Sequence, residues 1–177
     1  MLKSFFRVLW LASGLLLLYV LFSTYAEMSP TVFLTHDRSQ APVDRQLYFY
    51  GAAGIFLIYN ILLFIIVRMV PFLPKKALVV PNKAFWFSDR EHRKALNGVI
   101  QSWVFILSAL INMLFLILLE ITGSRNHVHG DLPFENTWHL PVLLAALVLL
   151  PLGLFIRLNM SKLEIMDNRD YSTPAKG

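Results

Sequence analysis

The sequence predicts an all-α integral membrane protein, a bundle of four transmembrane helices. Of its 177 residues, 56% are hydrophobic and 15% charged, and the mean hydropathy of +0.58 exceeds that of ordinary soluble domains. Four apolar stretches have the length that a helix needs to cross about 30 Å of hydrocarbon. They cover residues 8–25, 47–67, 100–121 and 138–156. The connections are too short to bury a core of their own, so we expect one membrane domain over residues 1–177.

The first apolar stretch follows Lys3 and Arg7 and ends near Ser23 to Ala26. The residues at this end resemble a weak signal-peptidase site. A cleaved signal peptide has a shorter apolar core, whereas this stretch is long enough to span the bilayer. We therefore expect it to be retained as a signal anchor.

The third span is expected to belong to a helix longer than the membrane requires. Ser88 and Glu91 have the spacing of a capping box, in which each side chain bonds the backbone amide of the other, and they predict a helix that starts at Asp89. No proline interrupts the segment, and Gly123 offers a left-handed stop. The first turns of this helix should project into the cytoplasm.

Two further features concern helix packing. Gly51 and Gly54 lie three residues apart in the second span, which favours the close approach of a neighbouring helix. Pro151 lies deep in the fourth span, where it removes a backbone donor and favours a kink.

The basic residues are unevenly distributed about the four spans. Thirteen of the sixteen Lys and Arg residues fall before the first span, in the connection 68–99 or in the tail 157–177. Because Lys and Arg are retained on the cytoplasmic side of short connections, we expect both termini and the connection 68–99 in the cytoplasm. Such a face favours contact with anionic lipid of the bilayer, and it lacks the folded or repeated basic surface of nucleic-acid-binding proteins.

Phe85, Trp86 and Phe87 form an aromatic triplet in the connection 68–99. Aromatic side chains suit the headgroup boundary, where the ring stays apolar and the indole N–H reaches water or ester oxygens. We therefore expect this turn to lie on the membrane surface.

The triplet belongs to a longer motif made by Pro81, Asn82, Phe85 and Trp86 and followed by Arg90. The motif resembles the Pro-Asn-Lys/Arg-x-aromatic-Trp signature of a poorly characterised family of small bacterial multi-pass membrane proteins, whose domain also opens the SdpI-type immunity proteins. The resemblance implies a helical protein of the bacterial plasma (inner) membrane. It carries no enzyme activity to transfer.

The first outer connection agrees in part with the same family. Pro30, His36 and Asp44 keep its spacings of six and eight residues. Ala41 replaces the glycine that the pattern expects, and Asp37 replaces an aromatic residue. A second proline before the histidine is missing, so the role of this loop can differ here.

Four of the five histidines fall in the outer connections: His36, His127, His129 and His139. An extended backbone would place His127 and His129 on one face, where His139 or Asp131 could complete a zinc or copper site. The simpler alternative is a solvated loop whose imidazoles cap backbone groups. Sensing of pH is a further alternative, because imidazole titrates near neutrality.

Three polar residues lie within or at the end of a predicted span: Asn60, Asn112 and Glu120. With the span midpoints at one level, Asn60 and Asn112 differ by roughly 7 to 8 Å in depth, so we do not expect them to pair directly. We expect hydrogen bonds to the backbone or to a partner subunit. Glu120 can reach the outer interface, and no chain of ionisable residues crosses the membrane.

No cysteine occurs, which excludes disulfides, thiolate metal sites and a cysteine nucleophile. The common phosphate-binding and hydrolase motifs are also missing, so we do not expect an enzyme. The favoured hypothesis is an accessory or scaffold subunit that binds other membrane-protein subunits. The alternatives are an immunity-like or sensor-like protein that uses its outer loops, and metal binding by the loop of His127, His129 and His139.

Overall fold

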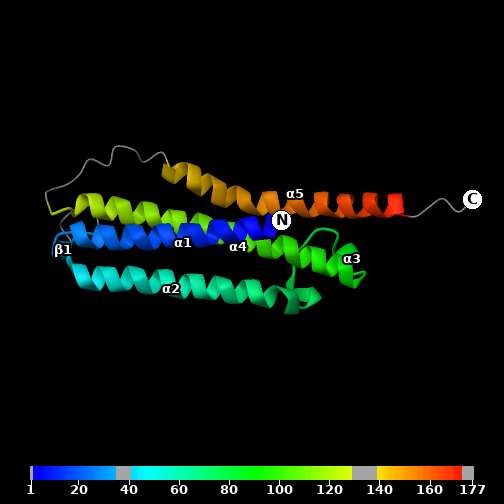
Figure 1. Cartoon of the computed structure of the whole chain (residues 1–177), viewed down its shortest axis with the longest axis horizontal. Coiled ribbons are helices and arrows are strands. Elements are labelled where there is room, and N and C mark those ends of the chain that lie inside the picture. Colours follow the sequence, from blue (N-terminus) through cyan, green and yellow to red (C-terminus); the bar gives the residue numbers. More distant parts are fainter. Residues whose placement is uncertain (1, 35–40, 129–138, 173–177) are drawn as a thin grey trace, which may run out of the picture.

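The computed structural model describes residues 2–34, 41–128 and 139–172. Four long helices run side by side, and short elements lie at both ends of the bundle (Figure 1). The elements in chain order are α1 (Leu2–Glu27), β1 (Thr31–Val32), β2 (Val43–Asp44), α2 (Arg45–Met69), the 3₁₀ turns η1 (Val70–Phe72) and η2 (Lys75–Ala77), α3 (Lys83–Trp86), α4 (Arg90–Arg125) and α5 (His139–Ser172).

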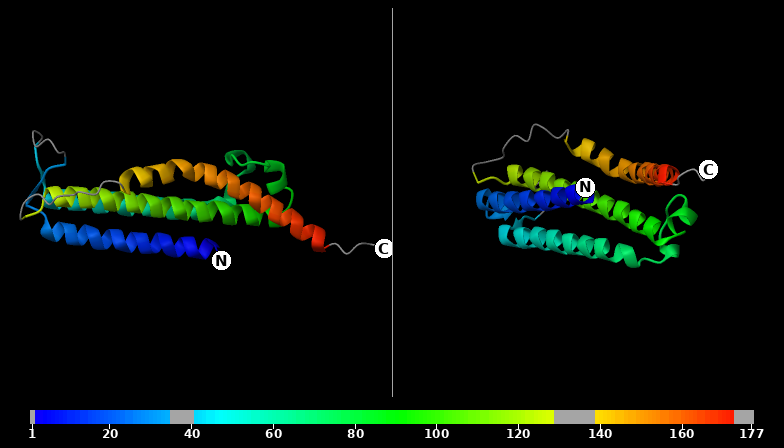
Figure 2. Two further views of the ribbon diagram at one scale, coloured as in Figure 1. Left: turned by 90° about the horizontal axis from the view of Figure 1, so that it is seen from above. Right: turned by 45° about the vertical axis from the view of Figure 1, so that its right-hand side comes forward.

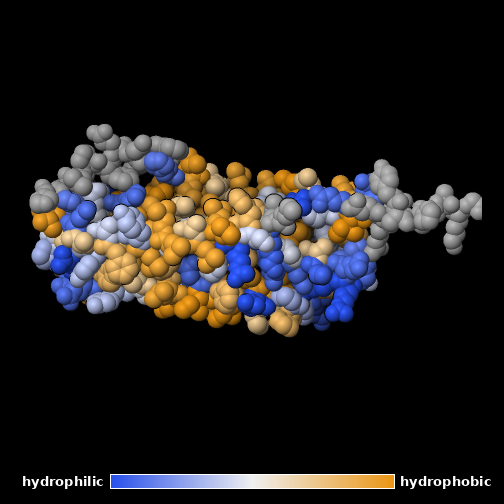
Figure 3. All heavy atoms as spheres, in the orientation of Figure 1, coloured by the Kyte–Doolittle hydropathy of each residue, from blue (hydrophilic) through white to orange (hydrophobic). Residues whose placement is uncertain are grey.

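All four long helices are long and apolar enough to cross a membrane, which confirms the predicted all-α architecture and identifies a candidate multi-pass membrane protein. Each predicted span lies within one of them, apart from the first residue of the fourth, which falls outside the described residues. On the visible surface, apolar side chains gather over the middle of the helices and polar ones over both ends (Figure 3). This banding is the pattern that a bilayer selects.

Helix α4 is the centre of the bundle. It packs along α1 on one side and against α5 on another, while α2 makes lighter contact with α1 and α4 (Figure 2). Near one end of α4 the backbone of Gly123 lies against Thr24, so close that an added Cβ atom would be 2.5 Å from Thr24 Cγ2. A Cβ on Gly153 of α5 would lie 2.7 Å from the Trp103 ring of α4. These two glycines permit the close helix contacts.

Gly51 and Gly54, which were predicted to allow close packing of a neighbouring helix, make no such contact in the described structure. No atom outside the immediate chain lies within 4 Å of where a Cβ on Gly51 or Gly54 would stand. Helix α2 therefore keeps these small residues beside open space in the described structure.

Both predicted ends of the third helix are shifted. The N-cap is Asp89, whose Oδ1 accepts from the amide of His92 at 2.8 Å, and not Ser88. The hydroxyl of Ser88 instead donates to the carbonyl of Phe85. At the other end the helix passes through Gly123 and stops at Arg125. The prediction that Gly123 ends this helix is therefore wrong. Gly123 instead allows α4 to pack closely against Thr24 of α1.

The predicted tail 157–177 is largely helical. Helix α5 continues past Pro151 and ends at Ser172. Leu158 in this extension is buried against Trp86 and Leu96, so the extension begins as part of the protein core.

Sequence analysis did not predict the small hairpin at the end of the bundle where α1 ends. Thr31 and Val32 pair antiparallel with Asp44 and Val43. Asp44 also caps α2, since its Oδ1 accepts from the amide of Gln46 at 2.7 Å. One residue thus closes the hairpin and starts the next helix.

Candidate functional site

A closed ring of hydrogen bonds joins α1, α2 and α4 inside the bundle. Trp10 donates from Nε1 to Oδ1 of Asn60 at 2.8 Å, and Asn60 donates from Nδ2 to Oδ1 of Asn112 at 3.1 Å. Asn112 donates to the hydroxyl of Ser13 at 3.1 Å, and Ser13 donates to the carbonyl of Trp10 at 2.8 Å. The expectation that Asn60 and Asn112 do not pair is wrong.

The polar side chains of this ring form hydrogen bonds with one another inside the bundle. Asn112 is fully buried and Ser13 is nearly so. No member is a titratable carboxylate, imidazole or amine, so the ring can fix helix positions but cannot move a proton as a relay would. Glu120 takes no part and is exposed on α4.

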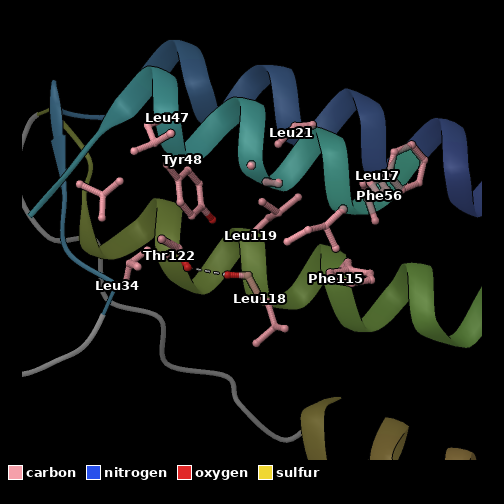
Figure 4. Close-up of a pocket in the computed structure, with 14 residues that line it drawn as sticks. Leu17, Leu21, Leu34, Leu47, Tyr48, Phe56, Phe115, Leu118, Leu119 and Thr122 are labelled. Atoms are coloured by element: carbon pink, nitrogen blue, oxygen red, sulfur yellow. Dashed lines mark hydrogen bonds between the residues drawn. The ribbon is translucent and has the colours of Figure 1, made fainter. Parts of the chain in front are cut away.

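An apolar pocket of about 310 Å³ lies between α1, α2 and α4. Leu17 and Leu21 of α1 face Phe56 of α2 and Leu119 of α4 across it (Figure 4). The hydroxyl of Thr122, one of its few polar groups, donates to the carbonyl of Leu118 at 2.9 Å. The lining is almost entirely apolar, so the pocket suits a hydrocarbon group.

At the opposite end of the bundle, His92 lies close to two groups that together suggest a catalytic triad. Its Nδ1 is 2.8 Å from the hydroxyl of Ser88 and 3.2 Å from Oδ2 of Asp89. A triad needs the hydroxyl on one ring nitrogen and the carboxylate on the other. Here both approach Nδ1, and the buried Nε2 has no hydrogen-bond partner among the described residues. The arrangement is therefore a cap for the start of α4.

The residues of the aromatic motif hold this end of the protein together. Trp86 is completely buried with Leu78, Leu96 and Leu158, so the expected contact of its indole N–H with water or ester oxygens is wrong. The place of this turn at the membrane surface stays a prediction. The ring of Phe85 stacks on His92 with centroids 4.1 Å apart.

Asn82 links the motif to α5. It has a left-handed backbone with φ of 53°, a conformation that Asn tolerates better than most residues. Its Nδ2 donates to Oδ1 of Asn159 at 2.8 Å, and its Oδ1 accepts from Lys162 at 3.2 Å. Pro81 directly precedes it, while Arg90 is exposed at the first turn of α4.

Sequence reasoning missed Arg93, which fastens the connection after α2. Its Nη2 donates to the carbonyl of Leu73 at 2.7 Å, and its guanidinium lies 4.4 Å from the centroid of the Phe87 ring. A basic residue one turn inside a helix that follows an irregular connection is the signal that was available, because such a side chain can reach back to free carbonyls.

The other end of the bundle is closed by Asn126. Its Oδ1 accepts from the amide of Phe33 at 2.7 Å, its Nδ2 donates to the carbonyl of Phe33 at 3.0 Å, and its own carbonyl accepts from Ser29. Arg45 adds a bond from Nη1 to the carbonyl of Met28, and its amide donates to the carbonyl of Pro30.

The predicted metal residues are only partly within the described structure. His36, His129 and Asp131 lie outside the described residues. His127 has Nε2 3.6 Å from Oε2 of Glu27, and His139 is the first residue of α5. Among the described residues no group of three His, Cys, Asp or Glu side chains could hold a metal. The zinc or copper hypothesis stays a prediction.

Comparison of the chain with protein-family models, with curated proteins and with solved structures finds no match.

Proposed function

We propose that this chain is a non-catalytic accessory or scaffold subunit of a larger assembly in a bacterial plasma membrane, with both termini in the cytoplasm. One observation carries the proposal. No residue of α5 from His139 to Arg157 is buried inside the chain, although this is the most apolar part of the helix. Lipid or another protein must cover that surface.

Helix α5 is suited to a partner by its shape as well as its exposure. Its close contact with α4 is made on the side of Gly153, while Val148, Leu149 and Leu152 are 77%, 59% and 57% exposed. These side chains are available for van der Waals packing against another protein, which is a main contribution to helix association in membranes.

The polar groups support a non-catalytic role. Asn60 and Asn112 are engaged in the hydrogen-bonded ring, and His92 lacks the two-sided geometry of a catalytic imidazole. No cofactor is part of the proposal.

Site-specific photo-crosslinking of the full chain in its native membrane tests the proposal. A crosslinking amino acid at Val148 or Leu152 should give a discrete higher-mass protein adduct. The same amino acid at Ile58, on α2 and 62% exposed, serves as the lipid-facing control and should give none. Adducts at none of the α5 positions, together with a free monomer by native mass spectrometry after gentle solubilisation, would refute the proposal.

A second candidate is an immunity-like or sensor-like protein. The observation that favours it is that Asn126 joins the two outer connections into one cap, so a ligand on one loop would act on both. A deletion strain challenged with envelope toxins, metals and antibiotics should then show a sensitivity. Absence of any phenotype, together with co-purification of a large complex, favours the scaffold.

Metal binding is tested separately. If the outer loop holds zinc or copper, elemental analysis should find less metal in the variant His127→Ala/His129→Ala than in the wild type. Equal content in both proteins rejects the site.

A further inference from the structure

A basic cavity of about 620 Å³ lies at the end of the bundle where α1 and α4 begin. We propose that it binds the phosphate of an anionic phospholipid, and that an acyl chain of this lipid follows the groove between α1 and α2. The inference is independent of the scaffold role.

Four cationic side chains line the cavity, and no acidic residue does. They are Lys3, Arg90, Arg93 and Lys94. Among the described residues no carboxylate forms an ion pair with any of them. Four positive charges around one hollow whose lining has no acidic side chain create a local attraction for a phosphate group.

Three of these cations lie near the start of α4, where Asp89 and Glu91 are the acidic residues that suit the helix dipole. Arg90, Arg93 and Lys94 occupy the first turns of α4, where the helix dipole is positive and favours anions. A bound phosphate would interact favourably with the same dipole.

Two unsatisfied polar atoms belong to residues of the cavity lining. Nη1 of Arg93 and Oδ1 of Asn97 are buried and have no hydrogen-bond partner among the described residues. The first needs an acceptor and the second a donor. Solvent does not reach either atom in this arrangement, so the attraction for a phosphate comes from the four cations and not from these two atoms.

Lys3 is held in place at the rim. Its Nζ donates to Oε1 of Gln101, and Nε2 of Gln101 donates to the carbonyl of Val67 at 2.9 Å. Gln101 is buried, so this pair fixes the ammonium group between α1, α2 and α4.

A separate apolar groove lies between α1, which also carries Lys3 of the cavity, and α2, which leads into the turn η1 that carries Pro71. It has a volume of about 350 Å³ and includes Trp10 and Gly14 of α1 and Phe64 and Asn60 of α2. Trp10 and Gly14 follow Lys3 by seven and eleven residues, a spacing that keeps them on one helix face. Phe64 and Asn60 precede Pro71 of the cavity by the same intervals. A lipid with its phosphate in the cavity would thus have an acyl chain directed along the groove.

The depth of the cavity suits a headgroup. Lys3 lies five residues before the predicted first span, which is roughly 7 to 8 Å along a helix. A free phosphate would interact with the basic cavity alone, whereas a phospholipid would also contact the apolar groove. The presence of both features therefore favours a phospholipid as the ligand.

Native mass spectrometry of the full chain in a non-ionic detergent tests the inference. The protein is titrated with dilauroyl phosphatidylglycerol and, separately, with dilauroyl phosphatidylcholine. We expect clearly tighter binding of the anionic lipid. The variant Arg90→Gln/Lys94→Gln should weaken that binding by roughly 5-fold for each charge removed and leave phosphatidylcholine binding unchanged.

The matched control is Lys76→Gln/Lys83→Gln, which removes two charges from the same end of the protein outside the cavity. It should change the binding by less than about 2-fold. Circular dichroism melting shows whether both variants keep the fold of the wild type, and Lys3→Gln replaces the double variant if that one unfolds.

Two competition experiments distinguish binding of a phospholipid from binding of a free anion. Inorganic phosphate and glycerophosphoglycerol, which has no acyl chains, should fail to displace the lipid at millimolar concentration. Displacement by either would overturn the proposal in favour of a free anion. Equal binding of the two lipids, or equal weakening by both double variants, would overturn it as well.

Discussion

Asn60 of α2 donates a hydrogen bond from Nδ2 to Oδ1 of Asn112 in α4 over 3.1 Å, and the second acceptor of the same amino group is the carbonyl of Phe56 at 3.0 Å. Asn60 therefore serves its own helix and a neighbour at once. The link matters because α2 otherwise packs only lightly on α4.

This pair should be energetically coupled. In a double-mutant cycle of Asn60→Ala and Asn112→Ala, we expect a coupling free energy of about 0.6 kcal/mol, with roughly 1.7 kcal/mol as the upper end for such bonds in membranes. The measurement is detergent-induced unfolding in mixed micelles. Ser124→Ala, which removes only a local bond to Ile121, is the control and should cost less. Strictly additive single variants would contradict the pairing.

Gly123 should resist any larger residue. Gly123→Ala places a Cβ 2.5 Å from Thr24 Cγ2, and such overpacking costs about 1–3 kcal/mol of unfolding free energy. Thr24→Ser removes the clashing methyl group and should restore most of the loss.

The control for that series is Gly51→Ala. Among the described residues, no atom beyond the neighbouring backbone of its own helix lies within 4 Å of the added Cβ. The gain in helix propensity should therefore make this change neutral or stabilising by up to about 1 kcal/mol. The same unfolding assay checks it. Equal destabilisation by the two alanines would show that Gly123 has no special contact.

Trp86 should contribute by its volume and not by its indole N–H. Trp86→Ala should cost about 3–5 kcal/mol, because it empties a fully buried site. Trp86→Phe should cost much less, since Nε1 has no hydrogen-bond partner among the described residues. Denaturant unfolding measures both.

Quenching distinguishes this burial from exposure of the ring. In a protein whose other tryptophans are replaced by Phe, Trp86 should be shielded from acrylamide. The exposed reference is Val79→Trp in the Trp86→Phe background, because Val79 is 99% exposed. If acrylamide quenched Trp86 and the tryptophan at position 79 to a similar extent, Trp86 would be exposed and not buried.

Asn126 should control the mobility of the segment around Phe33 at this end of the bundle. Asn126→Ala removes the bonds to the amide and carbonyl of Phe33. A loss of about 1 to 1.5 kcal/mol for one hydrogen bond corresponds to roughly 5- to 10-fold faster amide exchange at Phe33. Hydrogen-exchange mass spectrometry measures it. Asn159→Ala, at the other end of the bundle, should leave this exchange unchanged.

The four helices could be predicted because hydropathy and length alone require them. A run such as residues 47–67 must be helical if it lies in hydrocarbon, since every backbone donor and acceptor needs an internal partner. The structure gives α2 as Arg45–Met69, two residues longer at each end.

The particular contacts could not be predicted, because each depends on a residue far away in the sequence. Gly123 fits the rule for a helix stop until Thr24 is known to lie against it. Trp86 fits the rule for an interface until Leu158 of α5 covers it. Ser88 and Asp89 are both suitable N-cap residues. The hydroxyl of Ser88 bonds the carbonyl of Phe85 and lies next to the His92 ring, so Asp89 is the residue that caps α4.

The Asn60–Asn112 pair shows the limit of a depth argument. Setting the span midpoints at one level assumes that neighbouring helices are upright and in register. The actual register of α2 and α4 is fixed by contacts such as the bond from Gln101 to the carbonyl of Val67. Hydropathy contains no information about that register.

The central place of α4 has a consequence for synthesis of the chain. Ser13 of α1 meets its partner Asn112 across 99 residues of sequence, so α1 leaves the ribosome long before the helix on which it chiefly packs. The bond from Trp10 to Asn60 spans only 50 residues and becomes available as soon as α2 is inserted. It can hold the first helical hairpin together during translation. Arrival of α4 then completes the ring, so we expect α1 to gain its chief packing partner only after α4 has been synthesised.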